Sequence, residues 1–305
     1  VIKRMEAATG AHVVHVDARN YEEDLYGGYA QTIGAILQRQ RWPGGKGAPA
    51  AEGDDTPEPE VREDEVSILG YPFDRYEQDQ VGNVSEMRRL LYALGLKAKA
   101  VFFAGEPYAM LREVVHAKSH ILLPYAHSQS RALRKLGQPS IKTGLPMSLA
   151  GTRNWLTTIA EKLDLPGGRV EALIDAEMKR IKPLAELARR QLYGKQFAVF
   201  ADAPRAAGIV ATLIEMGMIP VTIGVLHFSL GGREKVERLL AKHHEIELPD
   251  FVQWLEDPTP EEVRDLARVA VQARGPQNGD RAQSRQRDAE RSGPPSDVGF
   301  HYAKV

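Results

Sequence analysis

The chain has 305 residues, of which 43% are hydrophobic and 27% charged, and its formal net charge is −1. This composition is typical of a globular protein in solution, and it gives no reason to expect nucleic acid or a membrane as a partner. Cysteine is absent, which excludes disulfides, thiolate nucleophiles and iron–sulfur clusters ligated by this chain alone. No apolar run is long enough to span a bilayer, and we expect a cytoplasmic protein.

The first part of the chain is typical of the end of an α/β domain. Residues 11–17 alternate like a strand, and residues 27–38 carry apolar side chains at helical spacing. We therefore expect residues 1–40 to be the last part of a truncated amino-terminal domain. Residues 41–64 are rich in glycine, proline, alanine and acidic residues, and they predict a linker or a surface insertion that buries little surface.

Strand and helix patterns then alternate over residues 65–165 and predict a Rossmann-like domain. The clearest helix has Asn83 as a possible cap, Glu86 three residues later as in a capping box, and Gly95 at its end. Further strands and a helix are expected at residues 97–103, 106–117 and 120–124.

Residues 139–164 predict a short strand, a loop and a helix that starts near Thr152. Such a unit directs several backbone N–H groups into one crevice, where a ligand can bind. We take Gly144, Gly151 and Thr152 as candidate cofactor-binding residues. The alternatives are that Thr152 only caps its helix and that the two glycines serve backbone geometry.

The remaining chain repeats the pattern after a long helical stretch. Residues 166–193 predict a bridging helix that Pro183 kinks or divides, and residues 194–272 predict a second Rossmann-like domain. Residues 273–305 are polar, lack apolar periodicity and are expected to be a disordered tail. The fold class is therefore α/β, with tandem Rossmann-like, doubly wound domains and mainly parallel sheets.

Three polar residues follow strands and are candidate catalytic groups. Asp202 and His227 end successive strands and could move protons as a pair, and His127 could relay a proton after an earlier strand. The alternative is that all three are ordinary polar residues at strand ends. No metal-ligand set is predicted, and no Gly-x-Gly-x-x-Gly fingerprint follows a strand, so the sequence does not predict that this chain binds NAD.

Taken in order, several segments resemble the nitrogenase component 1 family, which includes the nitrogenase molybdenum–iron protein and the light-independent protochlorophyllide and chlorophyllide reductases. The resemblance lies in the order of the segments and in the glycine and proline residues that bound them, rather than in any one segment. The matching segments are Val66-Ser-Ile-Leu-Gly-Tyr71, Ser85-Glu-Met-Arg-Arg-Leu-Leu-Tyr-Ala-Leu-Gly-Leu96, Ala117-Lys-Ser-His-Ile-Leu-Leu123, Gly144-Leu-Pro-Met-Ser-Leu-Ala-Gly-Thr-Arg-Asn-Trp-Leu156 and Gly194-Lys-Gln-Phe-Ala-Val-Phe-Ala-Asp-Ala-Pro204.

The resemblance implies a subunit that pairs with a homologous component 1 subunit and is reduced by an ATP-dependent iron–sulfur protein. It implies an iron–sulfur cluster or metallocluster that comes mainly from a missing amino-terminal region or from the partner, because none can be bound by a cysteine of this chain. Where the cofactor-bearing nitrogenase subunit has a further cysteine, this chain reads Pro124-Tyr-Ala-His127. This favours a β-type subunit or a tetrapyrrole-reductase relative, and it adds Tyr125 to the candidate cofactor-binding residues.

The leading hypothesis is thus an oxidoreductase subunit, inactive on its own, that shapes a cleft for a metallocluster or a tetrapyrrole. Two alternatives stay open. One is a non-catalytic scaffold for metallocluster assembly within the same family. The other is a generic two-domain α/β ligand-binding or glycosyltransferase-like protein, which rests on fold analogy alone.

Overall fold

The computed structural model describes residues 2–9, 13–16, 25–48, 57–71, 80–226 and 232–273. The chain falls into two compact units, Val1–Asp257 and Pro258–Val305. The first unit contains two parallel sheets. The described part of the second unit includes one helix, α10 (Pro260–Ala273). No helix among the described residues is long and apolar enough to cross a membrane.

The larger sheet has four parallel strands in the order β4-β3-β5-β6. β4 lies on one side of β3 and β5 on the other, so the order in which strands are added to the sheet reverses between β3 and β5. Ligands of open α/β sheets bind at such a switch point. The four strands are β3 (Arg62–Leu69), β4 (Lys97–Val101), β5 (Ala117–Leu122) and β6 (Ser140–Lys142).

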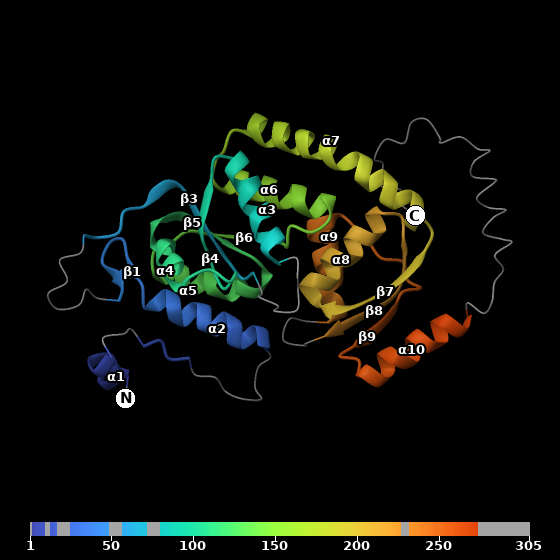
Figure 1. Cartoon of the computed structure of the whole chain (residues 1–305), viewed down its shortest axis with the longest axis horizontal. Helices are drawn as coiled ribbons and strands as arrows, with labels where there is room; N and C mark the ends of the chain where they lie inside the picture. The colour runs from blue at the N-terminus through green and yellow to red at the C-terminus, as the bar shows by residue number, and fades with distance from the viewer. Residues whose placement is uncertain are drawn as a thin grey trace. The chain divides into compact units, whose positions relative to one another are not determined.

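Successive side chains of these strands enter two different apolar cores, as the pleat of a strand requires. Ile68 and Ile121 belong to the core beneath α3 (Gln80–Ala93) and α6 (Leu149–Lys162). Their neighbours Leu69 and Leu122 belong to the core on the opposite face, beneath α2 (Leu25–Gln38). Helices therefore cover both faces of the sheet (Figure 1), which is the doubly wound arrangement predicted from the sequence.

The second sheet has three parallel strands in the order β7-β8-β9. Two helices, which contact each other, bury an apolar core against it. The strands are β7 (Gln196–Asp202), β8 (Ile219–Leu226) and β9 (Gln253–Glu256), and the helices are α8 (Ala203–Glu215) and α9 (Arg233–His244). Parallel sheets in both halves confirm the mixed α/β, Rossmann-like fold class.

A single long helix, α7 (Gly167–Leu192), connects the two sheets in sequence. Pro183 lies inside it, and the helix continues through this position rather than dividing there. The smaller elements are α1 (Ile2–Thr9), β1 (Arg41–Trp42), β2 (Lys46–Gly47), α4 (Tyr108–Leu111), η1 (Arg112–His116), η2 (Pro124–Gln129) and α5 (Ser130–Lys135).

The structure differs from the sequence predictions at several places. The expectation that residues 41–64 bury little surface is wrong at Trp42, which is fully buried and donates its Nε1 hydrogen to the Leu37 carbonyl at 2.8 Å. Residues 13–16 form no strand. Asn83 does not cap α3, because the helix begins three residues earlier at Gln80. Residues 274–305 lie outside the described residues.

Candidate functional site

The carboxyl edges of the two sheets meet at Tyr125 and Asp202. Tyr125 belongs to η2, directly after β5 at the switch point of the first sheet, and Asp202 is the last residue of β7 in the second. The Tyr125 hydroxyl donates a hydrogen bond of 2.5 Å to Oδ1 of Asp202. Tyr26, on α2, donates a second hydrogen bond of 3.0 Å to Oδ2. Both tyrosines and the aspartate are buried.

Asp202 also begins α8. Its side chain accepts a hydrogen bond of 3.2 Å from the Arg205 backbone N–H, and its extended backbone with Pro204 directly after Ala203 is favourable for a helix start. The Arg205 Nε atom lies 3.6 Å from Oδ2. One buried carboxylate thus accepts from two tyrosines, caps a helix and faces a guanidinium, which is how a protein compensates the burial of a charge.

The tyrosines at this edge hold their protons firmly. Burial raises the pKa of Tyr125 well above its ordinary value, and the neighbouring Asp202 charge raises it further. Burial likewise raises the pKa of Tyr29, whose hydroxyl donates a 2.6 Å hydrogen bond to the Tyr71 carbonyl. The Tyr26 and Tyr125 rings pack with their centroids 4.8 Å apart. These side chains act as neutral hydrogen-bond donors that fix the edge of the sheet.

His127 lies at the same edge but is held by backbone carbonyls. Its Nε2 atom is 2.9 Å from the Thr143 oxygen and 3.1 Å from the Leu122 oxygen, so Nε2 carries the proton. Burial lowers the pKa of His127 to about 4, and the nearby charges of Lys142 and Lys235 also lower it. The ring is therefore neutral at physiological pH. His227, the third predicted catalytic residue, lies outside the described residues.

The N–H groups at the start of α6 are occupied by the chain itself. The Glu215 carboxylate, from the end of α8, accepts hydrogen bonds from the Leu149 and Ala150 N–H groups at 2.7 and 2.9 Å. The Ser148 hydroxyl caps the helix by accepting from the Gly151 N–H at 3.0 Å. The crevice that the sequence predicted at residues 139–164 is thus filled by a carboxylate from another helix.

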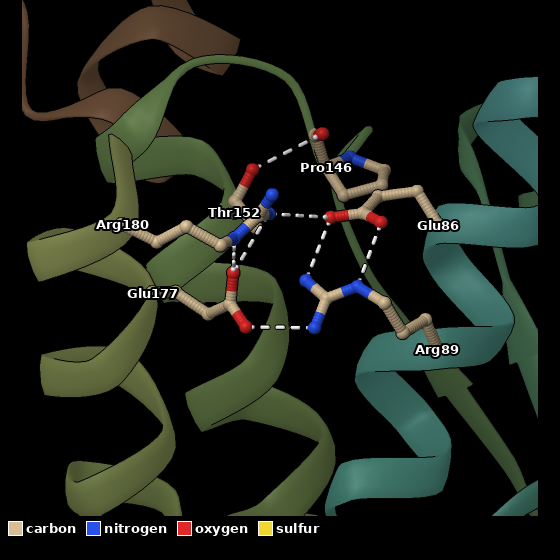
Figure 2. A network of polar contacts seen from close by, with 6 residues as sticks. All are labelled: Glu86, Arg89, Pro146, Thr152, Glu177 and Arg180. Carbon is tan, nitrogen blue, oxygen red and sulfur yellow. Dashed lines mark hydrogen bonds and ion pairs between the residues drawn. The ribbon is translucent and has the colours of Figure 1, made fainter. Parts of the chain in front are cut away.

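The prediction that Thr152 caps this helix is wrong, because the cap is Ser148, four residues earlier. The Thr152 hydroxyl instead lies 2.8 Å from the Ser148 carbonyl oxygen and 3.1 Å from that of Pro146 (Figure 2). Thr152 therefore holds the preceding loop against the first turn of the helix.

Gly144 and Gly151 are positions of close approach. A Cβ atom at Gly144 would lie 2.9 Å from Cγ of His243, and one at Gly151 would lie 2.5 Å from Cε1 of His244. His244 Nδ1 lies 3.0 Å from the Ser148 hydroxyl, and His243 Nδ1 lies 3.1 Å from Asn154 Oδ1. Burial lowers the pKa of both histidines to about 4. The end of α9 thus fits against α6 because the two glycines lack side chains.

A cavity of about 250 Å³ lies beside the start of α6, and aliphatic and methionine side chains make up half of its lining residues, the others being polar or charged. A closed ring of ion pairs joins α3 to α7 at this place (Figure 2). Arg89 binds Glu86 and Glu177, each at 2.7 Å, and Arg180 binds Glu177 at 2.8 Å and Glu86 at 3.2 Å. The ring fixes the relative position of the two helices.

The described residues do not fit a metal cluster held by this chain. They contain no group of three or more His, Cys, Asp or Glu side chains that could hold a metal ion. The whole sequence also lacks cysteine, the usual ligand of iron–sulfur clusters.

Sequence reasoning missed three residues that organise the site. Ser148 could have been found, because a serine directly before the first apolar residue of a helix, here Leu149, is a capping signal. Tyr26 and Glu215 could not, because each acts on residues that are distant in sequence: Tyr26 on Asp202 and Glu215 on Leu149.

Comparisons with known proteins agree on one family. The model of the nitrogenase component 1 type oxidoreductases matches residues 1–270. The chain is 29% identical over 115 residues to the light-independent protochlorophyllide reductase subunit N of Halorhodospira halophila, covering 37% of this chain and 27% of that protein. It is 21% identical over 195 residues to the nitrogenase molybdenum-iron protein beta chain of Bradyrhizobium diazoefficiens, covering 58% and 36%.

A solved structure of nitrogenase Cp1 at pH 5 superposes on 88% of this chain and on 56% of its own chain, with a TM-score of 0.64 and 15% sequence identity. At this identity the likeness shows a shared fold. The chain thus spans about half of this structural neighbour.

Proposed function

Because the chain belongs to the nitrogenase component 1 type oxidoreductase family, we propose that it is a subunit of a nitrogenase-like two-component reductase. In this proposal it pairs with a homologous component 1 subunit and receives electrons from an ATP-dependent iron–sulfur protein. Neither nucleic acid nor a membrane takes part.

The observation that carries the proposal is the meeting of two carboxyl edges at the Tyr125–Asp202 hydrogen bond. Ligands of open α/β sheets bind at carboxyl edges, and here the edges of two sheets are joined by buried contacts. Such a joint suits a large cofactor that must be held in a fixed orientation for electron transfer.

We assign the residues of this chain a shaping role. Tyr125 and Asp202 hold the two edges together, and Gly144, Gly151 and Thr152 set the course of the loop before α6. His127 is half-buried at the same edge and neutral at physiological pH, because burial lowers its pKa to about 4. The proposal gives His127, Asp202 and His227 the proton-transfer roles.

The cofactor in this proposal is a metallocluster or a tetrapyrrole. The names of two relatives point to these alternatives, since one is a protochlorophyllide reductase subunit and the other a molybdenum-iron protein chain. Because this chain has no cysteine, the thiolates of any cluster have to come from the homologous subunit or from protein beyond these residues. The residues at the two carboxyl edges would then hold the cofactor by shape and hydrogen bonds.

The proposal is tested by purifying the chain after co-expression with the homologous component 1 subunit from the same genome. We expect a stable complex in size-exclusion chromatography with light scattering. Tyr92→Phe, an exposed substitution on α3, serves as a control that leaves the complex intact. Two separate peaks at micromolar concentration, with both proteins folded, contradict the proposal.

A further inference from the structure

Three basic side chains lie along one face of α9. Lys235, Arg238 and Lys242 are spaced by three and four residues, which places them one above another on a helix surface over about 10 Å. Lys235 is half-buried, whereas Arg238 and Lys242 are exposed. A fourth cation, the exposed Lys142, ends β6.

The end of β6 is held against this helix. Gly144, two residues after Lys142, is in close contact with the His243 ring, which directly follows Lys242. The His127 ring is hydrogen-bonded to the carbonyl of Thr143. The charges of Lys142 and Lys235 both act on the half-buried His127 ring, since each lowers its pKa.

None of these four cations forms an ion pair within the described part of the chain. Of the two acidic residues on α9, Glu237 pairs with Arg233 at 2.7 Å, and Glu234 forms no ion pair with these cations in the described part of the chain. Two other lysines do form ion pairs: Lys97 lies 2.6 Å from Asp64, and Lys118 lies 2.8 Å from Glu63. The repulsion among like charges is visible at Lys235, whose pKa is lowered first by burial and then by Arg238 and Lys242.

We propose that Lys142, Lys235, Arg238 and Lys242 form a binding site for a small polyanion that carries at least three negative charges within about 10 Å. The site lies at the carboxyl edge of β6, where α/β folds bind ligands. Arginine and lysine together suit either phosphate or carboxylate groups. A ligand of this charge would pair with four cations that form no ion pair within the described residues.

A small ligand fits these observations better than an acidic protein surface. The three cations on α9 span about 10 Å and Lys235 among them is partly buried, so one small ligand can contact all three at once. This inference is independent of the reductase proposal, because it concerns a ligand of the isolated chain and needs neither a homologous subunit nor electron transfer.

The test is calorimetric titration of the purified chain at pH 7.5 and low salt with pyrophosphate, citrate and acetate. Pyrophosphate and citrate distinguish phosphate from carboxylate sources, and acetate reports attraction of a single charge. We expect at least one of the two polyanions to bind at one site about tenfold or more tightly than acetate, and its affinity to fall as sodium chloride is raised.

Two double variants probe the cluster from different elements. Lys235→Gln with Arg238→Gln, and Lys142→Gln with Lys242→Gln, are each expected to weaken polyanion binding about tenfold or more. Lys99→Gln with Lys162→Gln removes the same charge at exposed positions on β4 and α6. This control is expected to change the affinity for the polyanion less than about twofold. Circular dichroism confirms that each variant is folded.

Three results overturn the proposal. The first is no measurable binding of either polyanion at millimolar concentration. The second is equal weakening in the control and the cluster variants. The third is binding of only an acidic protein, lost in the cluster variants, which would make this face a protein-docking surface instead.

Discussion

The Tyr125 hydroxyl and the Asp202 carboxylate, 77 residues apart in sequence, form a hydrogen bond of 2.5 Å in a buried environment. This bond joins the carboxyl edge of one parallel sheet to that of the other. Because Asp202 also caps α8 and accepts from Tyr26, one carboxylate couples the orientation of three elements.

Removal of the Tyr125 hydroxyl tests this joint. In Tyr125→Phe the buried Asp202 loses one of its donors, and the free energy of unfolding is expected to fall by about 1–3 kcal/mol. Urea unfolding followed by far-UV circular dichroism measures it. Tyr92→Phe, at a tyrosine that is 71% exposed, is the matched control and is expected to change stability by less than about 0.5 kcal/mol. Equal effects of the two substitutions would contradict the role given to Tyr125.

Removal of the acceptor is expected to cost more. Asp202→Ala removes a helix cap worth about 1 kcal/mol and leaves the Tyr26 and Tyr125 hydroxyls without this partner, so we expect a loss of about 3 kcal/mol or more. In a double-mutant cycle, Tyr125→Phe should cost much less in the Asp202→Ala background, with a coupling energy of about 0.5–3 kcal/mol. Strictly additive effects would show that the hydrogen bond does not stabilise the fold.

The contact between Gly151 and His244 makes a steric prediction. A methyl group at Gly151 would lie 2.5 Å from the His244 ring, so Gly151→Ala is expected to destabilise the chain by about 1–3 kcal/mol. Gly168→Ala is the control, because nothing lies within 4 Å of its Cβ position. Thermal unfolding compares the two variants. The account is contradicted if Gly151→Ala is as stable as the control. It is also contradicted if Gly151→Ala lowers stability equally in a His244→Ala background.

Buried histidines predict loss of stability in mild acid. The pKa of each of His120, His127, His243 and His244 is lowered to about 4, mainly by burial. An unfolded histidine has a pKa of about 6.5, so their stabilising contribution is complete above pH 6.5 and is lost as the pH falls toward 4. Between pH 7.5 and 5.0 we expect a loss of roughly 1–2 kcal/mol for each histidine.

Between pH 7.5 and 5.0, the stability changes caused by histidines can be told apart from those caused by carboxylates. Hydrogen bonds from Arg89 lower the pKa values of Glu86 and Glu177, whose contribution is lost only below their ordinary pKa of 4.5. Urea unfolding at pH 7.5 and 5.0 therefore reports mainly on histidines. In His244→Gln the decrease between the two pH values should be smaller than in the parent chain, and an unchanged decrease would contradict the assignment.

Sequence patterns predicted the elements whose signals are local. The end of α3 at Gly95, which has a φ of 82°, agrees with the expectation because a glycine ends a helix through its own backbone. Residues 253–256 and 260–273 were not recognised as separate elements of their own. The strand over Gln253–Glu256 is too short, and has too weak a period, to be recognised without its partner β8.

The candidate site was predictable only in part, because its contacts are long-range. Its location at strand ends followed from the parallel β–α pattern, which brought Tyr125, His127 and Asp202 into consideration. The sequence could not show that Glu215 fills the start of α6, since 66 residues separate Glu215 from Leu149. Nor could it show that His243 and His244 fit against Gly144 and Gly151, a match that depends on the packing of α9 on α6.

The measurement that tests the central claim most directly is turnover in a reconstituted system. The co-purified complex of this chain with its homologous subunit is mixed with the ATP-dependent iron–sulfur protein, ATP and dithionite, and reduction of protochlorophyllide, chlorophyllide and acetylene is followed. The account predicts ATP-dependent reduction of one substrate that is lost when this chain is omitted. Equal turnover without the chain, or transfer of a metallocluster to another protein with no turnover at all, would contradict it.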